Sequence, residues 1–194
     1  FSNLKSPFII AEIGKNFIQT KEDLSVEEYI TNAKELIWRA KISGADAVKF
    51  QTHNYLDEQM NIESVVSPHF SDSDRYNWVK RNTLATPIKF WQEIIDYCKS
   101  LDILFFSTPM SRGAAEILNE LGVSIWKVGS GDILDFVLLD YLASTNKTII
   151  VSTGMSTLEE VDMMVEFLKS RNANIVLMHC VSKYPCTGNE LNLR

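Results

Sequence analysis

Apolar residues recur along the chain in six short runs, and each run carries or precedes a polar side chain. The runs occupy residues 8–11, 45–50, 103–106, 125–128, 148–151 and 175–178. Each has the usual length of a strand. Parallel strands that are buried on both faces appear in a sequence as near-continuous apolar runs of this kind. The pattern therefore predicts six buried, parallel strands.

Helical patterns separate these runs. Apolar residues recur at helical spacing in the segments 26–40, 88–100, 112–121, 135–144 and 158–169. Ser25 with Glu28, and Thr157 with Glu160, form capping boxes at the start of two of these helices. The segment 52–87 is polar and has no strong period, so we expect an irregular connection there.

The alternation of strands and helices predicts a parallel sheet with right-handed crossovers, for which two arrangements are open. An open, doubly wound sheet usually has a glycine-rich phosphate turn after its first strand, and residues 12–16 lack that pattern. A TIM (β/α)8-type barrel uses the C-terminal end of every strand, and a full barrel needs eight units and about 250 residues. We therefore expect an α/β barrel of which this chain covers about the first six βα units, as one incomplete domain over residues 1–194.

Composition narrows the class of function. The chain has 194 residues, is 45% hydrophobic and carries a net charge of −6, which fits one globular domain and argues against nucleic acid as the main partner. The three cysteines show no metal-binding spacing, and no apolar stretch is long enough to span a membrane. We expect a cytoplasmic protein without membrane association.

Two lysines lie inside predicted strands and are the first candidates for chemistry. Lys49 and Lys127 have apolar neighbours on both sides in sequence, and a lysine is rarely buried without a partner. Each can instead be a strand residue whose amino group reaches the surface. Two lysines that converge from different strands would form a binding site for phosphate or carboxylate.

Hydroxyl-bearing turns follow three of the strands. Thr108, Ser130 and Ser152 each stand at a predicted strand end, where a helix cap or an anion contact are both possible roles. Glu12 ends the first strand. It can form a structural ion pair with one of the lysines, or it can hold a substrate hydroxyl and move a proton.

Six motifs in their order along the chain resemble the N-acetylneuraminate (sialic acid) synthase family. They are AEIGKN (11–16), GADAVKFQT (44–52), FSTP (106–109), WKVGSGD (126–132), IVSTGM (150–155) and HCVSKYP (179–185). The resemblance implies a (β/α)8 barrel that acts as a transferase. It condenses phosphoenolpyruvate with an N-acetylated amino sugar, N-acetylmannosamine or its 6-phosphate, and releases phosphate.

The resemblance also implies roles for individual residues. Phosphoenolpyruvate contacts fall on Lys49, Gln51, Thr108, Lys127, Ser130 and Ser152. Glu12 matches the catalytic-site glutamate, Tyr184 matches a contact near the amino sugar, and Asp132 falls where the family has an acidic residue. Ser182 stands where the family often has Asn, and Phe17 stands where it usually has His.

The family's divalent metal, Mn²⁺ or Mg²⁺, is held by histidines after the seventh and eighth strands. We therefore expect no metal ligands in this chain. The resemblance implies a homodimer for the complete enzyme and a C-terminal antifreeze-like domain that this chain does not include.

Other functions remain open at this point. The chain can belong to a legionaminic, pseudaminic or 3-deoxy-octulosonate phosphate synthase, which also condense phosphoenolpyruvate with a sugar. It can also be a non-catalytic barrel segment that binds an anion or a partner protein.

Overall fold

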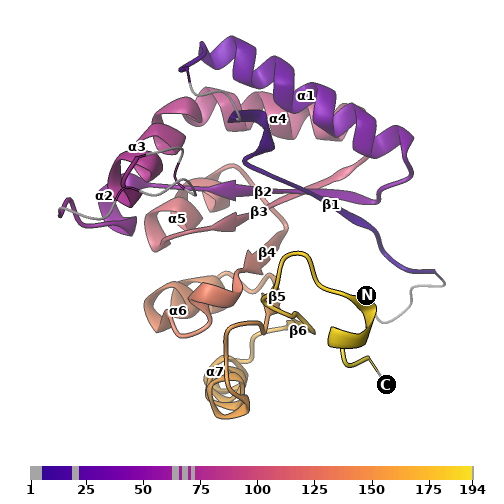
Figure 1. The fold of residues 1–194 in the computed structure, drawn as a ribbon, viewed down its shortest axis with the longest axis vertical. Helices are drawn as coiled ribbons and strands as arrows, with labels where there is room; N and C mark the ends of the chain where they lie inside the picture. The colour runs from indigo at the N-terminus through magenta and orange to yellow at the C-terminus, as the bar shows by residue number, and fades with distance from the viewer. Residues whose placement is uncertain (1–5, 19–21, 63–65, 67–69, 71–72, 194) are drawn as a thin grey trace. The chain divides into compact units, whose positions relative to one another are not determined.

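The computed structural model describes residues 6–18, 22–62, 66, 70 and 73–193. The chain forms two compact units, residues 1–123 and 124–194. In each unit, three parallel strands follow one another in chain order and alternate with helices (Figure 1). The protein is therefore of the α/β class, as the sequence pattern predicts. The assignment of residues 1–194 to one incomplete barrel domain stays a prediction.

Unit 1 begins with strand β1 and ends with helix α5. Its elements are β1 (Ile10–Gly14), a 3₁₀ turn (Asn16–Ile18), α1 (Val26–Ile42), β2 (Ala47–Thr52), α2 (Tyr55–Glu58), α3 (Arg75–Ala85), α4 (Ile88–Ser100), β3 (Leu104–Pro109) and α5 (Arg112–Glu120). Helices α1 and α4 lie side by side over one face of the three strands (Figure 1). Helix α5 packs against β3.

Aromatic side chains fill the core of unit 1. Phe17 packs on Phe90 with 4.9 Å between ring centroids and on Phe50 at 5.7 Å, and Trp91 meets Phe90 edge to face. Phe17 is 2% exposed. The position where the family usually has histidine is therefore part of the apolar core in this chain.

The segment 52–87 is not an irregular connection, which corrects the expectation from its sequence. It contains the one-turn helix α2 and the eleven-residue helix α3. Helix α3 buries only Val79, Asn82 and Ala85, so its apolar period is too weak to detect. Side-chain caps start both helices. Asn54 accepts a hydrogen bond from the N–H of Leu56, and Asp74 accepts one from the N–H of Asn77.

Unit 2 contains β4 (Ile125–Val128), a 3₁₀ turn (Ser130–Asp132), α6 (Phe136–Ser144), β5 (Thr148–Ser152), α7 (Leu158–Ser170), β6 (Ile175–Met178) and a last 3₁₀ turn (Gly188–Glu190). Trp126 is fully buried and donates from its indole nitrogen to Oγ1 of Thr145 at 2.8 Å. The rings of Phe136 and Phe167 join α6 to α7.

Strand β6 departs from the expected burial. It pairs with β5, yet Leu177 is 47% exposed and Met178 is 37% exposed. The apolar run is therefore a strand, as predicted, but it is not covered on both faces. In the described part of the chain, no helix is long and apolar enough to cross a membrane.

Candidate functional site

The first predicted lysine lies at the centre of unit 1. In the parallel register, Lys49 of β2 stands between Glu12 of β1 and Phe106 of β3. Its Nζ lies 2.7 Å from Oε2 of Glu12 and donates to Oγ1 of Thr108 at 2.9 Å. Lys49 is 7% exposed, whereas half of the Glu12 side chain is accessible. A buried ammonium group is thus held between a carboxylate and a hydroxyl group.

Burial changes the protonation behaviour of this lysine. Removal from water lowers the pKa of Lys49, and the negative charge of Glu12 partly opposes that shift. The sequence left two roles open for Glu12. The structure shows that Glu12 does form an ion pair with Lys49.

Gln51 and Gly14 complete this end of the β1–β2 pair. Gln51 stands beside Thr108 in the register of β2 and β3. Gly14 has φ +55°, and a side chain there would lie 3.1 Å from Oε1 of Glu12 and 3.9 Å from Cδ of Gln51. The glycine therefore lets the Glu12 carboxylate and the Gln51 amide lie close together beside the turn. Glu12, Lys49, Gln51 and Thr108 form one group, which we call the Lys49 cluster.

The second predicted lysine has a similar environment in unit 2. Lys127 of β4 is 7% exposed. Its Nζ donates to Oγ of Ser152, at the end of β5, and to the carbonyl oxygen of Val128, both at 2.6 Å. A second buried ammonium group is therefore also bonded to a hydroxyl group from the neighbouring strand.

Three turns meet near Lys127 at Gly154. The N–H of Gly154 donates to Oγ of Ser130 at 3.1 Å. A side chain at Gly154 would lie 2.5 Å from Oγ of Ser182 and 2.9 Å from Oγ of Ser130. The turns after β4, β5 and β6 therefore bring these two serines together. Lys127, Ser130, Ser152 and Ser182 form the Lys127 cluster.

Two predicted site residues are less closely tied to these groups. Oδ2 of Asp132 lies 3.0 Å from the position that a side chain at Gly129 would occupy, so Asp132 folds back over its own turn. Tyr184 is 95% exposed, and its ring contributes nothing to the packing of unit 2. Its expected contact with an amino sugar stays a prediction.

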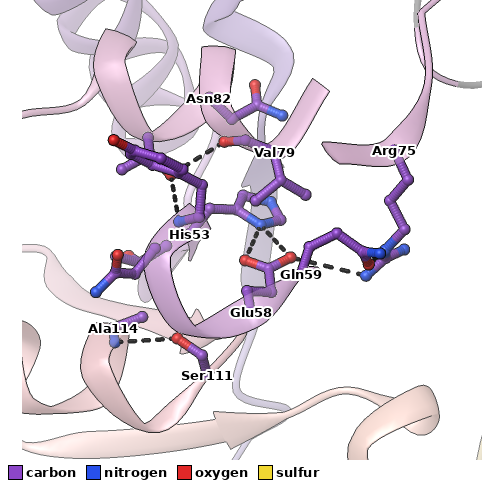
Figure 2. Close-up of polar contacts among 12 residues, drawn as sticks. His53, Glu58, Gln59, Arg75, Val79, Asn82, Ser111 and Ala114 are labelled. Atoms are coloured by element: carbon purple, nitrogen blue, oxygen red, sulfur yellow. Dashed lines mark hydrogen bonds and ion pairs between the residues drawn. The ribbon is translucent and has the colours of Figure 1, made fainter. Parts of the chain in front are cut away.

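A third polar group in unit 1 was not singled out from the sequence. Figure 2 shows Glu58 of α2 between His53 and Arg75. Nδ1 of His53 lies 2.7 Å from Oε2 of Glu58, and Nη2 of Arg75 lies 3.7 Å from Oε1. His53 directly follows β2, so the rule that selected Lys49 and Gln51 at this strand end would also have found it.

Lys15 belongs to the same surroundings. Part of this residue reaches the surface, but its Nζ is buried and has no hydrogen-bond partner within the described structure. Burial lowers the pKa of Lys15 to about 7, against the opposing charge of Glu58. Burial also lowers the pKa of His53, and the charges of Lys15 and Arg75 add to that shift. A neutral imidazole that donates from Nδ1 to Glu58 leaves Nε2 as an acceptor.

The two lysine clusters consist of the residues that the six sequence motifs contribute. A family model described as the NeuB family matches residues 36–194, which is most of the chain. The chain belongs to the NeuB family.

Curated relatives resemble this chain over nearly its whole length. It is 35% identical to an N,N'-diacetyllegionaminic acid synthase of Campylobacter jejuni, over 98% of this chain and 56% of the relative. It is 32% identical to the human N-acetylneuraminate-9-phosphate synthase, over 96% of this chain and 50% of the relative. The chain therefore spans about half the length of the curated relatives it matches.

A solved structure supports the same family. The chain resembles the sialic acid synthetase of Leptospira borgpetersenii with a TM-score of 0.74 and 27% identity, over 95% of this chain and 57% of that one. This likeness and the alternation of parallel strands with helices agree with the barrel-type α/β fold class predicted from the sequence.

Proposed function

We propose that this NeuB-family chain binds phosphoenolpyruvate and condenses it with an N-acetylated amino sugar, N-acetylmannosamine or its 6-phosphate. The product is a sialic acid, and phosphate is released. The observation that carries the proposal is Lys49, a buried ammonium group held between Thr108 and a partly accessible carboxylate, Glu12. An anion that enters this site can replace the Glu12 carboxylate as the partner of the Lys49 ammonium group.

Phosphoenolpyruvate has two anionic groups, a phosphate and a carboxylate. The described strands contain two buried lysines, Lys49 and Lys127, and each is bonded to a hydroxyl group at a strand end. Phosphate and carboxylate oxygens accept hydrogen bonds from ammonium and hydroxyl donors, and charged donors make the stronger bonds. We propose that Lys49 and Lys127 are each phosphoenolpyruvate contacts, with Gln51, Ser130 and Ser182 as further contacts.

The reaction forms one carbon–carbon bond and breaks one carbon–oxygen bond. The methylene carbon of phosphoenolpyruvate attacks the aldehyde carbon of the sugar, and the aldehyde oxygen takes up a proton to become a hydroxyl. A water molecule then adds to C2, which has become electron-deficient. Cleavage of the bond between C2 and the phosphate oxygen releases inorganic phosphate and leaves a 2-keto acid. Holding both reactants in place supplies a large part of the rate enhancement.

Glu12 has the right chemistry for the proton steps in this scheme. Half of its side chain is accessible, so it can reach a bound substrate or water as well as Lys49. When the anion of phosphoenolpyruvate binds Lys49, the Glu12 carboxylate is available to accept a proton from the water that attacks C2. Asp132 and Tyr184 are proposed contacts of the amino sugar.

The complete enzyme is expected to use a divalent metal, Mn²⁺ or Mg²⁺, and to form a homodimer. Within the part of the chain that the structure describes, no group of three or more His, Cys, Asp or Glu side chains is arranged to hold a metal ion. The steps above are therefore written for this chain's own residues alone.

A second candidate is a legionaminic or pseudaminic acid synthase, or another synthase that joins phosphoenolpyruvate to a sugar. The synthases that resemble this chain differ in the sugar acid that their names specify. A third candidate is a non-catalytic segment that binds an anion or a partner. The burial of Phe17 where the family usually has histidine is the observation in its favour.

Phosphate release separates these candidates. The full native protein is incubated with phosphoenolpyruvate, manganese and one N-acetylated amino sugar at a time, and inorganic phosphate is measured. We expect release with N-acetylmannosamine or its 6-phosphate. Release with a diacetylated sugar alone would instead identify the second candidate. Binding of phosphoenolpyruvate without release for any sugar would identify the third.

A further inference from the structure

Helix α2 is a single turn between β2 and α3, and its two acidic side chains hold different parts of unit 1. The Glu58 side chain is 3% exposed. Figure 2 shows it in contact with His53 and in an ion pair with Arg75. Asp57, the residue before it, bonds instead to the start of α5. Helix α2 is therefore fixed on one side by Glu58, and it holds Asp57 in a defined place.

Both oxygens of the Asp57 carboxylate are engaged at the N-terminus of α5. Oδ1 accepts from the hydroxyl of Ser111 at 2.9 Å, and Oδ2 accepts from the N–H of Gly113 at 2.6 Å. Ser111 is itself the N-cap of α5 and accepts from the N–H of Ala114 at 3.2 Å. A carboxylate at this end of a nine-residue helix also meets the positive end of the helix dipole.

Gly113 shows how closely the two segments approach. A side chain there would lie 2.7 Å from Oδ2 of Asp57 and 2.8 Å from Nδ2 of Asn54. Contacts that short do not occur, so an alanine at this position would displace the Asp57 carboxylate and the Asn54 amide. The sequence therefore provides a glycine at the point where Asp57 approaches the helix.

The same helix start is linked directly to the Lys49 cluster. Ser111 lies three residues after Thr108, whose hydroxyl accepts from Lys49 at 2.9 Å. Between them, the N–H of Met110 donates to the carbonyl oxygen of Thr52 at 2.9 Å. Only two residues therefore separate Ser111 from Thr108. A shift of the start of α5 would move the hydroxyl group that is bonded to Lys49.

We propose that Asp57 is a positioning residue for the anion site at Lys49. By holding Ser111 and Gly113, its carboxylate fixes the turn after β3 and keeps Thr108 in hydrogen-bonding reach of Lys49. This inference rests on the proposed function, because it names a residue that supports the site proposed to bind phosphoenolpyruvate. Asp57 itself does not touch the substrate in this account.

Three variants of the full native protein test the proposal. Asp57→Ala removes both hydrogen bonds, and Gly113→Ala pushes the carboxylate away while adding a residue that favours helix formation. Asp57→Asn keeps one acceptor and one donor, which suffice for Gly113 and Ser111. Ser25→Ala is the control. It also removes a helix N-cap, but Ser25 is the N-cap of α1 and is bonded to Glu28 rather than to Asp57.

The readouts are the Kd of phosphoenolpyruvate by titration calorimetry, the KM and kcat of phosphate release, and a crystal structure of Asp57→Ala. We expect Asp57→Ala and Gly113→Ala to raise Kd and KM by about five- to tenfold, because one hydrogen-bond partner of the anion site is misplaced. Their kcat should stay within about threefold of the wild type. Asp57→Asn and Ser25→Ala should stay within about threefold of the wild type. The crystal structure should show Thr108 out of hydrogen-bonding distance from Lys49.

Unchanged Kd in both Asp57→Ala and Gly113→Ala would overturn the proposal, as would an equal rise in Ser25→Ala. If the wild-type protein binds no phosphoenolpyruvate, the proposed function fails. The distance between Lys49 and Thr108 in the Asp57→Ala crystal then still decides whether Asp57 positions that pair.

Discussion

At the scale of single residues, the account depends on ammonium groups that water cannot solvate. Lys49 and Lys127 are buried, and both are bonded to hydroxyl groups. Lys49 has a carboxylate partner as well, and that carboxylate is half accessible. Burial of a charge costs several kcal/mol unless partners compensate it, and a bound anion is a partner of that kind.

Replacing either buried lysine should chiefly weaken the use of phosphoenolpyruvate. Lys49→Ala or Lys127→Ala in the full native protein removes a charge-assisted contact to a desolvated anion, a loss on the order of 2–4 kcal/mol. Steady-state kinetics with each substrate varied separately measure the effect. Exposed Lys99, which pairs with Asp96 on α4, provides the matched control as Lys99→Ala. Phosphoenolpyruvate parameters that stay unchanged in both variants would contradict the account.

Lys15 should make stability depend on pH. The folded-state pKa of about 7 lies below the unfolded value of about 10.4, so the unfolded chain binds more protons between these pH values. Stability should therefore rise with pH across this window, with a slope of up to about 1.4 kcal/mol per pH unit. The gain is complete above pH 10 and is lost as the pH falls to 7.

Urea unfolding from pH 6 to pH 10 measures that slope. Lys15→Met removes the buried amino group and should abolish the slope, and it should raise stability most at pH 7 and below. Lys99→Met removes an exposed amino group and should leave the slope in place. An equal slope in all three proteins would show that Lys15 is not its source.

Sequence reasoning found Lys49 and Lys127 because apolar neighbours on both sides make a strand lysine conspicuous. It did not find Glu58, because the short helix α2 has no apolar period, and it did not single out Lys15, although this residue directly follows β1. Only the folded chain shows that Lys15 is close enough to Glu58 for that carboxylate to oppose the lowering of its pKa, and close enough to His53 to lower the pKa of the imidazole. The places of Lys15 after β1 and of His53 after β2 were both visible in the sequence.

At the scale of elements, the turns that follow the strands bring the candidate site residues together more than the strand ends themselves do. In unit 2 the turns after β4, β5 and β6 pack around Gly154 so closely that a side chain there would displace the hydroxyls of Ser182 and Ser130. The sequence predicted the strands and helices of both units because burial and capping leave periodic signals. It missed α2 and α3, which are held by polar side chains.

Gly154→Ala should destabilise unit 2. The added methyl group would meet Oγ of Ser182 at 2.5 Å and Oγ of Ser130 at 2.9 Å, which costs about 1–3 kcal/mol for a crowded site. Gly131→Ala is the matched control, because a methyl group there meets nothing within 4 Å and should change stability by less than about 0.5 kcal/mol. Denaturant unfolding measures both. Equal stability of the two variants would show that the three turns can separate freely.

At the scale of the whole molecule, the described chain has two outer strands. β1 pairs with β2, and β6 pairs with β5. Strand β6 also leaves Leu177 and Met178 partly exposed. Unpaired strand edges with apolar side chains promote association with other chains. The relatives that resemble this chain are about twice as long as the part that it matches.

Residues 1–194 expressed alone should therefore be inactive as a synthase and soluble only where another chain or further residues cover these edges. Phosphate release from phosphoenolpyruvate, N-acetylmannosamine and manganese tests activity, and light scattering tests association. Robust turnover by a monodisperse monomer would contradict this expectation. Such a result would mean that the site is complete within these residues.

The central claim is that Lys49 binds an anionic group of phosphoenolpyruvate. A crystal structure of the full native protein with phosphoenolpyruvate tests it most directly. The account predicts that Nζ of Lys49 lies at about 3 Å from an oxygen of the ligand, with Thr108 beside it. A structure with the ligand bound away from Lys49 would contradict it.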